Sequence, residues 1–268
     1  MITIYQIYYQ ENQKKYLEKD FIPYNNEYGN AKWFEYGVFE KEYRENPIAK
    51  EELRGYVSWK FRQKTKISGQ EFLDFIKRNP GYDVYFINPY EFDALAFPNV
   101  WYQGEFYHPG ILSFSQKLLD HAGYSLDLHL LQTKPLEAAF CNYWIGNQKF
   151  WDLYMDFTIP LFEYIENKLT TEEKDFLFSK ADTKIKANYI PFIMERMFST
   201  LLATKSDTIL YKKFSPSLQQ VLTKPRHFFY SALYKIRKID DAIFKKPVIT
   251  STFFKLRHIR EVLHNKNI

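Results

Sequence analysis

The sequence predicts an α/β domain with a mainly parallel, twisted sheet flanked by helices, followed by a basic helical tail. Strand-like and helix-like segments alternate along the chain, an order typical of parallel α/β sheets. The chain has 268 residues, of which 46% are hydrophobic and 19% aromatic, enough for a large core. From Thr204 onward, 14 Lys and Arg residues accompany 4 Asp and Glu residues, a charge of +10 in a chain whose total is +5. We therefore expect a folded domain over 1–203 and a basic aromatic tail over 204–268.

The N-terminal part begins with a predicted strand. Ile2–Tyr9 is β-branched and aromatic and is expected to be buried. The acidic, Asn- and Tyr-rich stretch Gln10–Asn46 is predicted to be a loop with short helices. Connections of this length inside a compact domain are often functional. Gly55–Lys66 fits either a helix or a strand.

A helix and a strand follow, with clear boundaries. Ser68–Arg78 is a predicted helix, because Ser68 and Glu71 match the capping-box pattern. Asp83–Asn88 is a predicted strand that ends before Pro89.

The secondary structure of the rest of the chain is predicted from the spacing of its hydrophobic residues. Further strands are expected at Leu126–Leu131 and Ala138–Ile145. Helices are expected at Ile111–Ala122, Gln148–Leu169 with an interruption at Pro160, Thr171–Ser179, Pro191–Ala203, Phe228–Phe244 and Phe253–Asn265.

Composition also predicts a location. Cys141 is the single cysteine, so no internal disulfide can form, which fits a reducing compartment. No signal peptide and no run of about 18 apolar residues is visible, so we expect a cytoplasmic protein. The basic tail favours contact with an anionic leaflet, on the inner face of the cytoplasmic membrane. No nucleic-acid partner is expected, because no nucleic-acid-binding motif is present.

Several enzyme classes are disfavoured by missing motifs. The nine glycines form no phosphate-binding loop, which argues against kinases and Rossmann dehydrogenases. One Cys and six scattered His offer no zinc spacing. No G-x-S-x-G nucleophile elbow occurs, which argues against α/β-hydrolases.

An ordered set of unusual phrases remains, and their order resembles a GT-A-like bacterial glycosyltransferase. They are YQIYY, GYVSWKFRQKT, DVYFINPYEFDA, NVWYQGEFYHPG, FCNYWIGNQKFWDLYMDF and YIPFIMERMFSTLL. The chain is similar over Ile2–Ala203 to the galactofuranosyltransferase domain of the bifunctional galactan polymerases that build O-antigen. Each phrase alone is weakly specific, and the signal comes from their order.

The resemblance implies a GT-A-like catalytic domain and a reaction. A hexose such as galactofuranose would pass from a UDP-sugar to a lipid-linked saccharide in O-antigen or capsule biosynthesis, by an inverting displacement. The donor would lie at the carboxyl edge of the sheet, where an aromatic ring can stack on the nucleobase and cations can hold phosphate. The donor-binding candidates are Tyr9, Trp59, Lys60, Arg62, Lys64, Asn88 and Tyr90.

One departure from the GT-A pattern concerns the metal. GT-A enzymes usually carry Asp-x-Asp at the end of the central strand, whereas this chain has Asn88 there, with Glu91 and Asp93 beyond. Either these two carboxylates hold Mn²⁺ or Mg²⁺, or cations from the GYVSWKFRQKTK segment neutralise the diphosphate instead.

The candidate catalytic residues are ionisable side chains that stand in an apolar helix or in a tight loop. Glu195 stands in an apolar helix and is the first candidate for the base that deprotonates the acceptor hydroxyl. Glu105 and His108 are its rivals, and a structural Glu195–Arg196 ion pair is the alternative interpretation. The acceptor-binding candidates, which could equally be core or structural residues, are Asn142, Trp144 and Arg196.

Two rival functions remain at this point. The first is a transferase-like scaffold or binding protein of a polysaccharide-assembly complex, favoured by the missing Asp-x-Asp. The second is a basic membrane or nucleic-acid adaptor, favoured by the tail alone.

Overall fold

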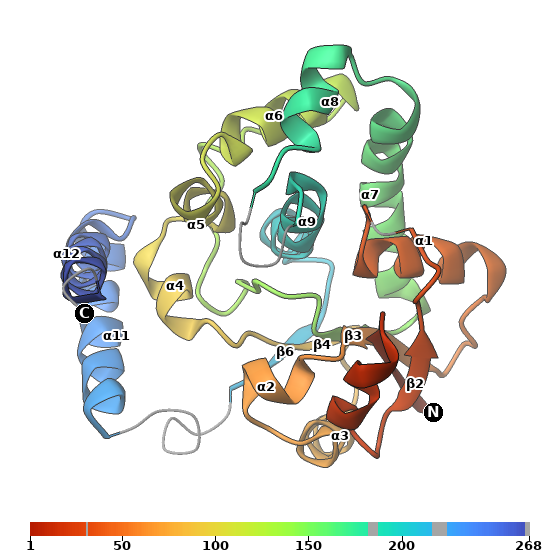
Figure 1. The fold of residues 1–268 in the computed structure, drawn as a ribbon. Helices are drawn as coiled ribbons and strands as arrows, with labels where there is room; N and C mark the ends of the chain where they lie inside the picture. The colour runs from red at the N-terminus through yellow and green to blue at the C-terminus, as the bar shows by residue number, and fades with distance from the viewer. Residues whose placement is uncertain (31, 182–186, 216–223, 266–268) are drawn as a thin grey trace.

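The computed structural model describes residues 1–30, 32–181, 187–215 and 224–265, and within the last range the side chains of 228–256 (Figure 1). In the described part of the chain, six strands form one sheet in the order β2-β1-β3-β5-β4-β6. Only the two pairs that involve β5 are antiparallel, so a mainly parallel sheet is confirmed. The strands are β1 (Ile2–Tyr8), β2 (Ile22–Asn25), β3 (Leu53–Ser58), β4 (Val84–Ile87), β5 (Trp144–Gly146) and β6 (Tyr211–Phe214).

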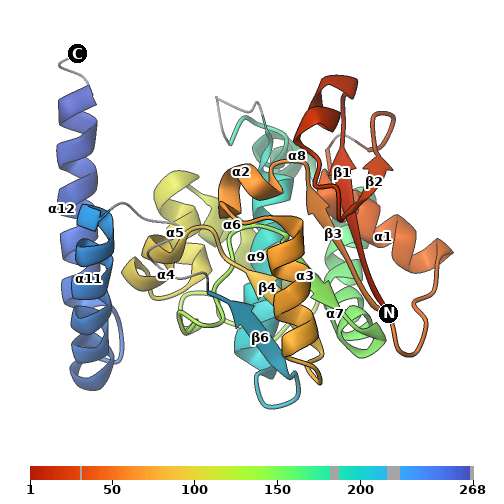
Figure 2. The same ribbon diagram turned by 90° about the horizontal axis from the view of Figure 1, so that it is seen from below.

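Helices cover both faces of this sheet (Figures 1 and 2). Alternate residues of a strand point to opposite faces. Accordingly, Val84 and Phe86 enter the larger core, whereas Tyr85 and Ile87 enter a smaller core with α2 and α3. The helices are η1 (Glu11–Tyr16), α1 (Glu35–Glu45), α2 (Phe61–Thr65), α3 (Gly69–Arg78), α4 (Glu91–Ala96), α5 (Val100–Tyr107), α6 (Ile111–His121), α7 (Gln148–Asn167), α8 (Thr171–Leu177), α9 (Tyr189–Lys205), α11 (Lys224–Ile243) and α12 (Val248–Asn265).

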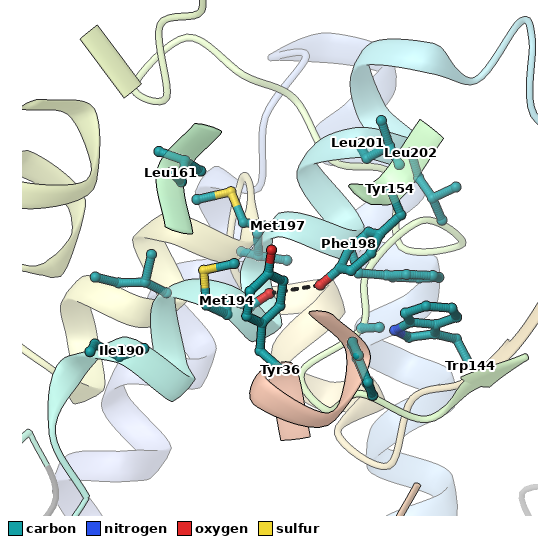
Figure 3. Packing of buried hydrophobic residues seen from close by; sticks show 14 of the residues in the cluster. Tyr36, Trp144, Tyr154, Leu161, Ile190, Met194, Met197, Phe198, Leu201 and Leu202 are labelled. Atoms are coloured by element: carbon teal, nitrogen blue, oxygen red, sulfur yellow. Dashed lines mark hydrogen bonds between the residues drawn. The ribbon is translucent and has the colours of Figure 1, made fainter. Parts of the chain in front are cut away.

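Helix α9 runs through the larger core (Figure 3). Most of its side chains from Tyr189 to Leu202 are buried, and only Phe192 and Glu195 in that run keep partial exposure. The Tyr154 hydroxyl of α7 donates to the Met194 carbonyl at 3.4 Å. Because residues three apart share a face of a helix, Phe192 and Glu195 lie on one side of α9.

Local predictions of the first half are largely confirmed. Ser68 and Glu71 form a capping box at the start of α3, with the Glu71 amide 3.2 Å from the Ser68 hydroxyl. The ambiguous segment Gly55–Lys66 is both strand and helix, since β3 ends at Ser58 and α2 begins at Phe61. The long segment before it was predicted as loop with short helices; it contains the helices η1 and α1, and also the parallel strand β2, which was not predicted.

Three predictions about the middle of the chain are wrong. Leu126–Leu131 is not a strand, because the Asp127 side chain accepts from the His129 amide at 2.8 Å and turns the backbone. Of Ala138–Ile145, only the end is extended, in the short antiparallel β5. Pro160 does not interrupt α7, since buried residues on both sides of it hold the helix against the core.

The sheet also continues beyond residue 203, into the segment predicted as tail. Strand β6 pairs in parallel with β4, from Val84 opposite Tyr211 to Ile87 opposite Phe214. Helices α11 and α12 then form a hairpin beside α4 (Figures 1 and 2). Asp240 joins the hairpin by accepting from the Thr250 amide at 2.8 Å. Within the described residues, no helix combines the length and apolarity needed to cross a membrane.

Candidate functional site

The carboxyl ends of the parallel strands meet at one edge of the sheet. The Trp59 amide, just after β3, donates to the Ile7 carbonyl of β1 at 2.8 Å. The Ile87 amide at the end of β4 donates to the Tyr143 carbonyl at 3.0 Å. Since β5 runs antiparallel, the residues before it are brought to this same edge. In open α/β sheets ligands bind at such an edge.

Lys64 occupies this edge from helix α2. Its ammonium donates to the Cys141 sulfur at 3.3 Å and lies 5.9 Å from the Tyr143 ring centroid. The Tyr143 hydroxyl is 3.0 Å from the Ser58 hydroxyl at the end of β3. Cys141, Tyr143 and Glu195 all hold the pKa of Lys64 above its usual value. Burial raises the pKa of Cys141 to about 12, so a protonated Lys64 faces a neutral thiol at pH 7.

Glu195 brings a carboxylate to the same cluster from α9. Burial raises the pKa of Glu195 from 4.5 to about 7, while the positive charge of Lys64 opposes the rise and the negative charge of Glu35 adds to it. The side chain still keeps part of its surface exposed to solvent. A carboxylate with a pKa near the working pH can act as a general base.

Glu35 is a second carboxylate that sequence reasoning missed. It stands in the first turn of α1, after Phe34, whose φ of 49° is unusual for a bulky residue. Burial raises the pKa of Glu35, and the ammonium groups of Lys64 and Lys60 oppose that rise. Strained backbone often marks functional positions. The sequence signal was weak, because the residue lies inside the segment predicted as loop with short helices.

Two polar groups at this edge are buried without a hydrogen-bond partner among the described residues. They are the Asn88 side-chain amide nitrogen and the Asn142 side-chain carbonyl oxygen. Buried polar groups are nearly always satisfied in folded proteins. Asn88 follows β4 and Asn142 precedes β5, so a ligand at the edge could supply their partners. The Tyr9 hydroxyl, just after β1, instead hydrogen-bonds to the Glu35 carboxylate.

The remaining donor candidates divide between the two sides of α2. Lys60 lies over the Trp59 ring, 5.0 Å from its centroid, and its charge acts on Glu35. Arg62 instead is 64% exposed and lies 3.6 Å from Glu18. Residues two apart on a helix point in different directions. Lys60 and Lys64 thus belong to the cluster, and Arg62 lies apart from it.

Tyr90 remains close to the cluster and partly exposed. Burial raises the pKa of Tyr90. The Cys141 sulfur adds to this rise, and the Lys64 ammonium opposes it. Its ring is 42% exposed, so one face can still meet a ligand.

The two rival bases have structural partners. Glu105 accepts from the amides of Gly110 at 2.8 Å and Leu112 at 3.0 Å, which fixes the start of α6. His108 is buried, stacks on Phe192 with ring centroids 3.9 Å apart, and its Nδ1 lies 2.9 Å from the Ala181 carbonyl oxygen. These contacts favour roles in positioning the chain.

Arg196 and Trp144 differ from the expected acceptor contacts. Arg196 is 3% exposed and donates to the Val100 carbonyl at 2.9 Å and to the Gln103 side chain at 2.5 Å. Its guanidinium therefore stabilises the packing of α5 on α9, and no ion pair with Glu195 occurs among the described residues. Trp144 is 1% exposed and packs between aromatic rings of the larger core, so it is a core residue.

The metal candidates do not form a metal site. Glu91 pairs with the Lys213 ammonium at 2.8 Å, and Gln103 donates to Asp93 at 2.9 Å. In the described ranges, no three His, Cys, Asp or Glu side chains are grouped so that they could hold a metal ion. Mn²⁺ and Mg²⁺ need several oxygen ligands around one point. Glu91 and Asp93 thus do not fit such an ion here.

The fold is similar to that of WbbM, a bifunctional glycosyltransferase whose apo structure is known. The similarity has a TM-score of 0.52 with 12% sequence identity, and it covers 79% of this chain and 44% of the WbbM chain. No protein-family model and no curated protein sequence matches the chain. At this identity the similarity concerns the fold alone. The chain therefore has a glycosyltransferase-like fold, a mixed α/β sheet flanked by helices, with its polar cluster at the carboxyl edge.

Proposed function

We propose that the protein is a glycosyltransferase that uses Glu195 as its general base. One observation carries the proposal. Glu195, a partly exposed residue on an otherwise buried helix, has a pKa of about 7 and interacts with the charge of Lys64 at the carboxyl edge of a glycosyltransferase-like fold. Perturbed carboxylates beside a specific charge partner are candidates for catalysis.

The proposed reaction is a single, inverting displacement. Ionised Glu195 accepts the proton of an acceptor hydroxyl, and that oxygen forms a bond to the anomeric carbon of the donor sugar. The bond from that carbon to the nucleoside diphosphate breaks, and the diphosphate leaves with the electron pair. The product is the glycosylated acceptor, and the configuration at the anomeric carbon is inverted.

Lys64 and Lys60 are the groups proposed to stabilise the leaving diphosphate. Both are half-buried, and both charges act on the carboxylates of this cluster. Positive groups fixed in a partly dry site stabilise a developing negative charge more strongly than in water. The unpartnered Asn142 side chain and the Tyr9 ring would bind the sugar and the nucleotide.

The substrates are proposed from the sequence resemblance. The donor is a UDP-hexose, such as UDP-galactofuranose, and the acceptor is a lipid-linked saccharide in surface-polysaccharide assembly. The protein would then work at the inner face of the cytoplasmic membrane. The excess of Lys and Arg after residue 204 supports a position at an anionic surface.

Release of UDP tests the proposal. The purified chain is incubated with UDP-galactofuranose, UDP-galactose or UDP-glucose and a lipid-linked saccharide, and UDP is measured by a coupled assay. Acceptor-dependent release that Glu195→Gln abolishes is expected. Binding of UDP-sugars without any release would favour the transferase-like scaffold, and no binding at millimolar donor would refute the donor site.

A further inference from the structure

A cavity of about 590 Å³ lies next to the candidate site and shares Asn88 with it. Its inner wall includes Asn88 and Thr65, the neighbour of Lys64 in α2. Helix α11 forms the opposite wall with Tyr230 and Tyr234. The cavity is therefore bounded by the edge of the sheet on one side and by the C-terminal hairpin on the other.

The walls of this cavity are largely apolar, but their charge is positive. The charged side chains that line it are Lys134, Lys213, Arg237, Lys238, Glu91 and Asp241, a net charge of +2. Both carboxylates are already paired, Glu91 with Lys213 at 2.8 Å and Asp241 with Arg237 at 2.7 Å. Lys134 is paired as well, with Glu137 at 3.3 Å, so the unpaired positive charge of the described lining comes from Lys238.

Lys238 is the cation best placed to meet a ligand. Its ammonium lies over the Tyr234 ring, 5.0 Å from the centroid, and in the described part of the chain no carboxylate lies within ion-pair distance of it. On the opposite wall, the Asn88 amide nitrogen is buried and lacks a hydrogen-bond partner among the described residues. An ammonium and a free N–H on facing walls suit phosphate oxygens.

The outer surface of the same hairpin is apolar and basic. Exposed apolar side chains at its turn include Ile243, Phe244 and Phe253, at 65%, 44% and 49% exposure. Lys245 and Lys246 stand exposed beside them. Apolar side chains flanked by lysines are typical of surfaces that rest on an anionic bilayer. A ligand with a hydrocarbon chain could thus pass from a bilayer to the cavity along α11.

We propose that this cavity binds the lipid-phosphate end of the acceptor, with the phosphate between Lys238 and Asn88 and the first hydrocarbon units against Tyr230 and Phe92. The proposal rests on the proposed function, because it supplies the acceptor for that reaction. Apolar walls alone would favour a neutral lipid, and positive charge in the walls alone would favour free phosphate. Their combination favours an anionic amphiphile.

Binding of farnesyl diphosphate, a water-soluble isoprenoid diphosphate, tests the proposal in the full chain. Titration calorimetry should give saturable binding, with weaker binding of the uncharged alcohol farnesol. Lys238→Gln should weaken farnesyl diphosphate binding roughly fivefold, the effect of removing one partly solvated charge contact. Lys235→Gln is the matched control, since Lys235 is exposed on the same helix and does not line the cavity.

Three results would overturn the inference. Farnesol could bind as tightly as the diphosphate, inorganic pyrophosphate could displace farnesyl diphosphate at equal concentration, or the two lysine variants could behave alike. Failure of the proposed function is a separate result. Farnesyl diphosphate binding without any UDP release would refute the transferase reaction alone, whereas UDP release without farnesyl diphosphate binding would refute the cavity assignment alone.

Discussion

Replacing Glu195 by Gln should stabilise the protein above neutral pH while abolishing its activity. Burial raises the pKa of Glu195 from 4.5 to about 7, so the folded protein binds this proton more tightly than the unfolded chain. Stability from this group is therefore present at pH 4 and is lost as the pH rises through 7. One pKa unit corresponds to about 1.4 kcal/mol, so the ionised carboxylate lowers the unfolding free energy at pH 8 by up to about 3 kcal/mol.

Thermal unfolding at two pH values measures this difference. At pH 8 the Glu195→Gln variant should melt roughly 6–12 °C above the parent protein, because about 1 kcal/mol corresponds to 2–4 °C at this size. Below pH 4.5 both proteins should melt together, since the parent carboxyl is then protonated. Glu27→Gln is the control, because Glu27 is exposed and its replacement should leave the melting temperature unchanged at either pH.

Activity gives the second measurement on the same variant. Glu195→Gln should lower kcat about 10²- to 10⁴-fold, the range for a positioned base, with donor affinity unchanged. The parent rate should rise with pH through an apparent pKa near 7. Glu35→Gln should shift this rise in rate to lower pH, because the charge of Glu35 raises the pKa of Glu195. Near-full activity of Glu195→Gln would refute the assignment and pass the role to Glu105 or His108.

Three further predictions concern the donor site, the core and the metal. Lys64→Gln should abolish the rise in melting temperature caused by UDP. Arg62→Gln, on the other side of α2, should retain that rise. Equal effects of the two variants would contradict the assignment of Lys64, and not Arg62, to the donor site. Gly104→Ala should lower the unfolding free energy by about 1–3 kcal/mol in urea titrations, because the added Cβ would lie 2.5 Å from the Arg196 Nε. An unchanged midpoint of urea unfolding would mean that the guanidinium moves freely. EDTA should leave most of the activity, since Lys64 supplies positive charge near the proposed diphosphate; complete loss that Mn²⁺ restores would show a metal requirement.

Local signals in the sequence were enough to predict several elements of secondary structure. The first strand, the capping box at Ser68 and the helix around Glu195 follow from neighbouring residues, because side-chain period and capping act over a few positions. The order of motifs also indicated a glycosyltransferase-like fold, which the structural similarity supports. Glu195 was predicted because a charge in an apolar helix is costly unless it has a role.

Which charged residues share a site depends on how distant segments pack together. Lys64 and Arg62 are equivalent in sequence, but the packing of α2 turns Lys64 toward Cys141 and leaves Arg62 beside Glu18. Glu35 joins the cluster because α1 begins beside Lys64 and Lys60, and contacts of α1 with α7 and β3 set that placement. Burial and pKa depend on groups brought together from distant segments, and the local sequence does not encode those distances.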